Sequence, residues 1–196
     1  MALTDTAFQL QRVPGAIAVP GAYSVRLTVA GQSQTHGFTL KADPRVSATP
    51  ADFRARFDLT QRVTAAMADV VEEIDGIATL RAATEARRAS AGSHQDLEKT
   101  LRRFSDSLAV WSRRLGTPRY PSSDADPYST SSLSELQRFT YADPNSAPNQ
   151  AERTGSVEAL ARARRQLEDV KRAIAVALPP VNDALKAAGQ SPLPTR

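Results

Sequence analysis

The chain has no cysteine and only two histidines among its 196 residues. The missing cysteine excludes both a disulfide framework and a thiolate metal site. Aromatic residues make up only 6% of the sequence, so the core must consist mainly of leucine, valine, isoleucine and alanine. No stretch approaches the roughly 20 consecutive apolar residues that a membrane-spanning helix requires.

The sequence also lacks the common motifs of enzyme sites. His36 and His94 have polar neighbours in the sequence and belong to no spaced set of metal ligands. There is no Gly-x-Ser-x-Gly elbow and no glycine-rich phosphate-binding loop. We therefore predict no catalytic residue, no cofactor-binding residue, no metal site and no cofactor.

One acidic patch on a predicted helix was weighed as a metal site. It comprises Asp69, Glu72, Glu73 and Asp75. Carboxylate metal sites in helical bundles combine inward glutamates with a Glu-x-x-His motif, which this sequence does not contain. The patch therefore predicts a solvated acidic face.

The net charge of +4 raises the question of nucleic-acid binding, because 21 of the 25 basic residues are arginine. Acidic residues are interspersed among them, as Glu85 is beside Arg87 and Asp106 is near Arg103. Mixed signs of this kind are typical of a solvated helical surface rather than a phosphate-binding stripe. We predict no nucleic-acid partner.

The first residues, MALTDTAFQLQR, have neither a basic start nor an apolar run, so no secretory signal peptide is predicted in them. As written, the chain is expected to stay in the cytoplasm where it is made. Its true compartment remains open at this point.

A β-hairpin is predicted between Val19 and Val46. Pro20-Gly21 signals a turn, and the odd positions from Tyr23 to Val29 are apolar, with polar residues between them. Phe38 and Leu40 resume this alternation in a second strand. Asp43-Pro44 ends it, because proline has no backbone donor to continue a ladder.

This stretch resembles a family. The pattern P-G-x-Y-x-V-R-L-T-V-x-G, followed by a strand and D-P-R-V, occurs at the end of the immunoglobulin-like module of bacterial sialidase-like and sortilin-like (BNR-repeat) β-propeller proteins. The chain carries it as Pro20-Gly21, Tyr23, Val25 to Val29, Gly31 and Asp43 to Val46. The resemblance covers roughly residues 13–60. It implies a C-terminal, truncated part of a glycosyl hydrolase-related protein whose relatives are usually exported.

The predicted fold class is α+β, mostly α. Residues 1–46 are expected to form a partial immunoglobulin-like β-sandwich with three or four short strands. A complete sandwich of this kind has about seven strands. The missing strands predict a sheet with at least one open edge.

An antiparallel helical bundle is predicted for residues 47–190, with irregular loops at 117–130 and 142–155 and a tail at 191–196. Thr49, Pro50 and Asp52 indicate the start of a long first helix. Ser93 is predicted to cap the second helix, whose apolar seam steps by four and three residues. That seam comprises Leu97, Leu101, Phe104, Leu108, Trp111 and Leu115.

The last helices complete the bundle. A short helix is predicted from Ser132 to about Tyr141, and a longer one is expected to break at Pro179-Pro180. Trp111 is interpreted as a core residue. Tyr120 and Tyr128, in a loop rich in proline and serine, are the better candidates for exposed contacts.

The leading functional hypothesis is a non-catalytic accessory module that packs against a propeller or another protein. The predicted partner is a protein, or a second copy of the chain, bound through the β unit. Whether it binds carbohydrate stays open. One alternative is a glycoside hydrolase-related protein whose activity resides in a propeller not present here, since the propeller would carry that chemistry. Another is an independent helical adaptor.

Overall fold

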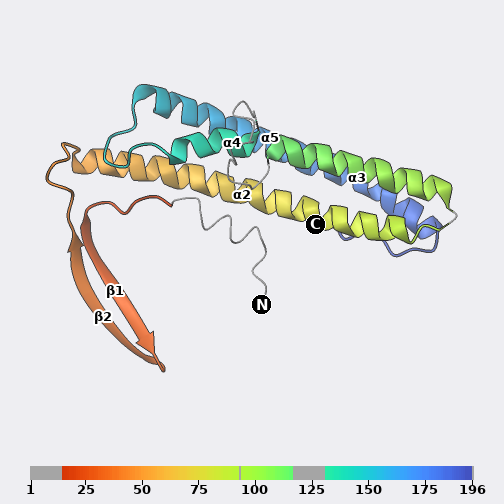
Figure 1. The fold of residues 1–196 in the computed structure, drawn as a ribbon, viewed down its shortest axis with the longest axis horizontal. Helices are drawn as coiled ribbons and strands as arrows, with labels where there is room; N and C mark the ends of the chain where they lie inside the picture. The colour runs from red at the N-terminus through yellow and green to blue at the C-terminus, as the bar shows by residue number, and fades with distance from the viewer. Residues whose placement is uncertain (1–14, 93, 117–130, 196) are drawn as a thin grey trace.

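The computed structural model describes residues 15–92, 94–116 and 131–195. Within them the chain forms one antiparallel hairpin followed by a bundle of helices, which confirms the α+β, mostly α fold class. The helices lie along a common long axis, and the hairpin projects from one end of the bundle (Figure 1).

The hairpin consists of β1 (Gly21–Val29) and β2 (Gln32–Leu40). Its two-residue turn places Ala30 at φ 49° and Gly31 at φ 81°. Both central residues thus have positive φ, which is what a type I′ turn requires. This type of turn suits the twist of paired strands. These are the only two strands in the described residues, fewer than the three or four expected for residues 1–46; residues 1–14 lie outside the described part of the chain.

Helix α2 (Pro50–Ala89) begins where the sequence predicts. Thr49 accepts a hydrogen bond from the backbone of Asp52, and the Asp52 carboxylate accepts one from the Thr49 backbone. Pro50 takes the first helical turn, where its missing N–H costs nothing. One stripe of α2 is buried along its length: Leu59, Val63, Ala66, Met67, Val70, Val71, Ile74, Ile77 and Leu80.

Helix α3 (Gln95–Leu115) runs back along α2 (Figure 1). Its predicted seam is confirmed, since Leu97, Leu101, Phe104, Leu108 and Leu115 are buried and Trp111 packs half-buried against the same core. The residue before the helix is His94, which makes no side-chain capping bond. Ser93, the predicted cap, lies outside the described residues.

Two short elements follow, α4 (Ser132–Gln137) and the 3₁₀ helix η1 (Arg138–Thr140). Helix α4 lies against the end of α3, where Gly116 has φ 126°, and η1 packs on α2. A Cβ atom on Gly116 would lie 2.8 Å from the Cβ atom of Leu133. This close approach therefore requires glycine.

Helix α5 (Gln150–Ala187) runs in the same direction as α2 (Figure 1). It begins within the stretch 142–155 that was predicted to be irregular, and it continues through Pro179 and Pro180. The expected break at these prolines was wrong. They free the carbonyls of Ala175 and Val176, which belong to exposed residues and can bind water, while buried Val181 and Leu185 continue the apolar stripe.

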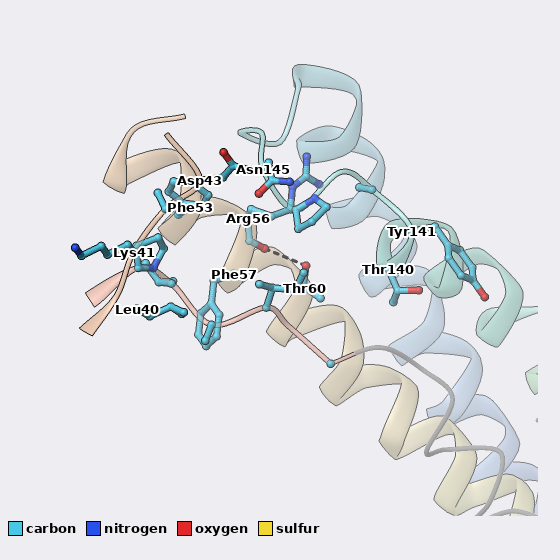
Figure 2. A pocket seen from close by; sticks show the side chains of 18 residues that line it. Leu40, Lys41, Asp43, Phe53, Arg56, Phe57, Thr60, Thr140, Tyr141 and Asn145 are labelled. Atoms are coloured by element: carbon cyan, nitrogen blue, oxygen red, sulfur yellow. Dashed lines mark hydrogen bonds between the residues drawn. The ribbon is translucent and has the colours of Figure 1, made fainter. Parts of the chain in front are cut away.

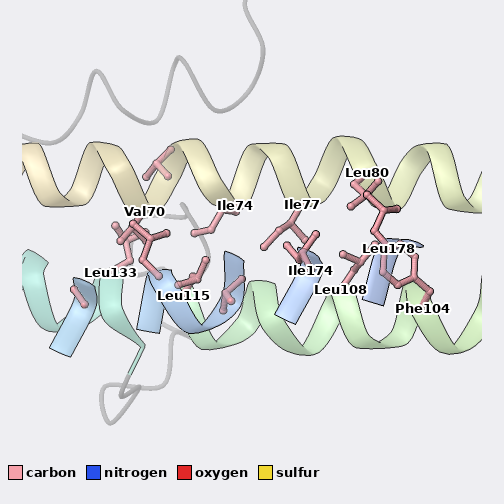
Figure 3. Packing of buried hydrophobic residues seen from close by; sticks show 14 of the residues in the cluster. Val70, Ile74, Ile77, Leu80, Phe104, Leu108, Leu115, Leu133, Ile174 and Leu178 are labelled. Carbon is pink, nitrogen blue, oxygen red and sulfur yellow. The ribbon is translucent and has the colours of Figure 1, made fainter. Parts of the chain in front are cut away.

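A single apolar core joins α2, α3, α4 and α5 (Figure 3). Ile77, Leu101 and Leu108 are at most 1% exposed within it. The C-terminal residues also belong to it, because Leu193 is buried and its backbone exchanges two hydrogen bonds with the Asn182 side chain. None of the described helices is both long and apolar enough to cross a bilayer.

Candidate interaction surface

The two faces of the hairpin differ in composition. Residues paired across the strands share a face, and the register pairs Gly21 with Leu40 through to Val29 with Gln32. We call one side the apolar face. Its large apolar side chains are Tyr23, Val25, Leu27, Val29, Phe38 and Leu40. The opposite side carries serine, threonine and Arg26.

The apolar face is open to solvent. Leu27 is 66% exposed, Val29 63% and Val25 55%, and even the paired rings of Tyr23 and Phe38 are more than a third exposed. Single exposed apolar residues are ordinary, whereas a contiguous set that follows both strands marks an interaction site. The helices therefore leave this face uncovered.

Among the described residues both outer edges of the hairpin are also open, because the sheet there contains only these two strands. Proteins usually protect such edges with charges, prolines or bulges. The register runs without a bulge over nine residues on each strand, and neither strand contains proline. Arg26 is the only charged residue in either strand. The edges thus have little of the usual protection against pairing with another strand.

Tyr23 holds the start of β1 in place through two contacts. Its hydroxyl donates a hydrogen bond of 2.5 Å to the carbonyl oxygen of Val19. Its ring stacks on Phe38 across the ladder, with centroids 5.9 Å apart. The residue therefore ties the segment before the strand to the first rungs of the hairpin.

The exit from β2 is a turn closed by an ion pair. Arg45 donates to both carboxylate oxygens of Asp43, with the shortest distance 2.7 Å, and the Val46 N–H bonds the Asp43 carbonyl. The Arg45 guanidinium and backbone N–H lower the pKa of Asp43. Because this pair is exposed, it shapes the turn more than it stabilises the protein.

A cavity of about 250 Å³ lies where the hairpin meets the bundle (Figure 2). Its lining comes from three segments: the residues that flank the hairpin, the start of α2 and the loop before α5. Phe53, Phe57 and Tyr141 supply its aromatic walls. Side chains therefore leave unfilled space between the hairpin and the bundle.

Beside this cavity, Arg56 links α2 to the loop before α5. It is 6% exposed and donates two bonds of 3.0 Å to the Glu152 carboxylate and two more to the carbonyls of Ser146 and Ala147. The Arg56 guanidinium is the main cause that lowers the pKa of Glu152. Sequence reasoning missed this link, although Asn149-x-x-Glu152 has the spacing of a capping box.

The residues weighed as chemical candidates do not converge on a site. Asp69 and Glu72 are exposed, as a solvated face requires, whereas Glu73 is buried between α2 and α5. Within the described ranges, no three histidine or acidic side chains lie close enough together to hold a metal ion. Tyr120 and Tyr128 lie outside the described residues.

His36 was assigned polar surroundings from its sequence neighbours, and that assignment was wrong. The register places it opposite Val25, on the middle rung of the apolar face. Period-two alternation could have revealed this, because His36 shares its parity with Phe38 and Leu40.

Comparisons with known proteins add no assignment: no family model, curated protein or solved structure matches the chain.

Proposed function

We propose that the chain is a non-catalytic interaction module, and that it corresponds to the C-terminal part of a bacterial sialidase-like or sortilin-like β-propeller protein. Its hairpin would supply the last two strands of an incomplete immunoglobulin-like sandwich. The observation that carries this proposal is the exposed apolar face of the hairpin. A two-stranded hairpin cannot cover such a face by itself.

The Tyr23 hydrogen bond supports the sandwich part of the proposal. In immunoglobulin-like domains, a tyrosine at the start of the penultimate strand donates its hydroxyl to the backbone a few residues upstream. Tyr23 stands at the start of β1 and donates to Val19, four residues upstream. A single tight turn then leads to β2, after which the chain leaves the sheet for α2.

A facing sheet is the partner that this geometry fits best. Packed sheets bury one face each and leave the other in water. The hairpin has such a division, with the apolar side chains on one face and Arg26 on the other. Any glycoside hydrolysis associated with the module would reside in the propeller.

Binding can be tested with a defined probe. The probe is the polypeptide of a sialidase-like propeller protein, truncated before the last two strands of its immunoglobulin-like module. Calorimetry should detect binding to the whole chain, and Leu27→Asp should abolish it by placing a charge in the apolar interface. Ser24→Asp, which puts the same charge on the polar face opposite Gly37, should bind like the wild type. Absence of binding by the wild type would favour the independent helical adaptor.

Catalysis is tested separately. The purified chain should release no fluorophore from sialosides or other glycosides above a buffer control. Turnover that survives repurification and disappears when one carboxylate of this chain is replaced would overturn the non-catalytic assignment.

A further inference from the structure

The apolar face of the hairpin is complementary to itself. We propose that two copies of the free chain cover it for each other, face to face. This inference concerns the surface discussed above but does not depend on the propeller partner.

The exposed area suits a weak dimer. Aromatic side chains bury roughly 150 to 250 Å² each when fully covered, and we take a value near the lower end of this range for valine and leucine. The exposed fractions of the six side chains, from 36% to 66%, then leave on the order of 500 Å² per copy, or about 1,000 Å² for two. This lies at the lower end of specific interfaces, so we expect dissociation constants in the micromolar range.

The shape of the hairpin permits the approach. It projects from the end of the bundle (Figure 1), and its ladder continues without a bulge from Gly21 to Val29. Two such hairpins, stacked about 10 Å apart, would form a four-stranded, two-layer unit with polar outer faces. A twofold axis through the middle of the ladder would give the largest overlap and would bring the middle rungs of the two copies together.

Charge does not oppose this contact at neutral pH. Arg26 points to the polar face, because it pairs with Thr35 on the alternate rungs. The apolar face has no lysine, arginine or carboxylate in its ten positions. Its remaining polar residues are Gln32, Gln34 and His36.

His36 stands on the middle rung of this face, opposite Val25 and diagonal to Tyr23 and Leu27. The described part of the chain leaves it exposed. A charge placed at this position would lie between the apolar layers of the dimer without a carboxylate to balance it.

Sedimentation velocity over about 1 to 200 µM at pH 7.5 tests the dimer. The wild type should show a monomer–dimer equilibrium in the micromolar range. Leu27→Lys should weaken association by about 100-fold or more, because the buried charge has no partner. Ser24→Lys, with the same charge on the polar face, should match the wild type, and helical circular dichroism should confirm that both variants keep the bundle.

The same measurement on two variants of His36 tests the middle rung. His36→Lys places a fixed charge between the apolar layers and should weaken association as strongly as Leu27→Lys. His36→Gln, which carries no charge, should still form the dimer.

Three results would overturn the inference. They are a wild type that stays monomeric at every concentration, a dimer indifferent to Leu27→Lys, or oligomers that grow beyond two copies through the open edges. None of them bears on binding of the truncated propeller polypeptide, so failure of this inference is separable from failure of the proposed function.

Discussion

The hairpin and the bundle use apolar residues in opposite ways. In the bundle, Leu108 and Leu101 have no exposed surface, whereas Leu27 in the hairpin is 66% exposed. Apolar residues recur every 3.5 residues on average in α3 and every two residues in β1. Periodicity therefore identifies the face that will be buried, but it does not say whether the same chain buries it.

The difference has a physical origin in the partners available to each element. The three long helices, α2, α3 and α5, each present an apolar stripe, and these stripes pack together in one buried core. The two strands share one apolar face, and pairing with each other satisfies only their inner backbone groups. Within the described residues the apolar stripes of the helices are thus covered. The hairpin forms one sheet layer, and its apolar face has no second layer packed on it.

Hydrogen exchange should give the largest contrast between the two regions. Core amides of α3 should be protected by about a thousandfold or more over those of β1, because they open only on global unfolding while an isolated hairpin is marginally stable. Stronger protection of residues 23–29 than of α3 would contradict the division into a stable bundle and a loose hairpin.

The same substitution in both regions sharpens the comparison. Leu108→Ala should lower the free energy of unfolding by about 2 to 5 kcal/mol, because it leaves a cavity in a closed core. Leu27→Ala should change it by about 0.5 kcal/mol or less, as is usual for exposed positions. Urea denaturation followed by helical circular dichroism measures both, and equal effects would mean that Leu27 is buried in solution.

The Arg56 link should have an intermediate effect. Arg56→Met removes two charged hydrogen bonds to Glu152 and two to backbone carbonyls, which should lower the free energy of unfolding by about 1.5 to 3 kcal/mol. Arg62→Met, an exposed arginine on the same helix, is the matched control and should have little effect. Equal stabilities of the two variants would show that Arg56 is dispensable.

This link should also shape the pH dependence of stability. The pKa of Glu152 is lowered in the folded protein, chiefly by the Arg56 guanidinium, so its contribution is fully present above the ordinary value of 4.5. The contribution is lost as the pH falls through the lowered pKa. Denaturation curves below pH 4.5 should therefore fall more steeply for the wild type than for Arg56→Met, and parallel curves would rule out this role.

The helices were predicted correctly where the capping residues and the spacing of the buried apolar residues indicate the same helix. The Thr49 capping box and the α3 seam are both confirmed. The sequence-based prediction was wrong at Pro179-Pro180. The two prolines predicted the end of the helix, whereas buried Val181 and Leu185 extend the core beyond them. Tertiary packing outweighed the backbone preference there.

The candidate surface was only partly predictable. Alternation identified the apolar residues of the hairpin, and the parity that His36 shares with Phe38 and Leu40 could also have placed it on the apolar face. Arg56 was missed because its partners lie about 90 residues away. The resemblance to propeller proteins remains a proposal.

The smallest expected effect concerns the entry into β1. Tyr23→Phe keeps the stacking on Phe38 and removes only the hydroxyl that bonds Val19. Because this bond is exposed, its loss should cost about 0.5 kcal/mol, at the low end for hydrogen bonds. The cost should appear as faster amide exchange in the hairpin while the urea midpoint of the bundle stays unchanged. A shift of that midpoint would mean that the two regions unfold together, and an unchanged hairpin would mean that the Tyr23 hydroxyl does not fix the start of the strand.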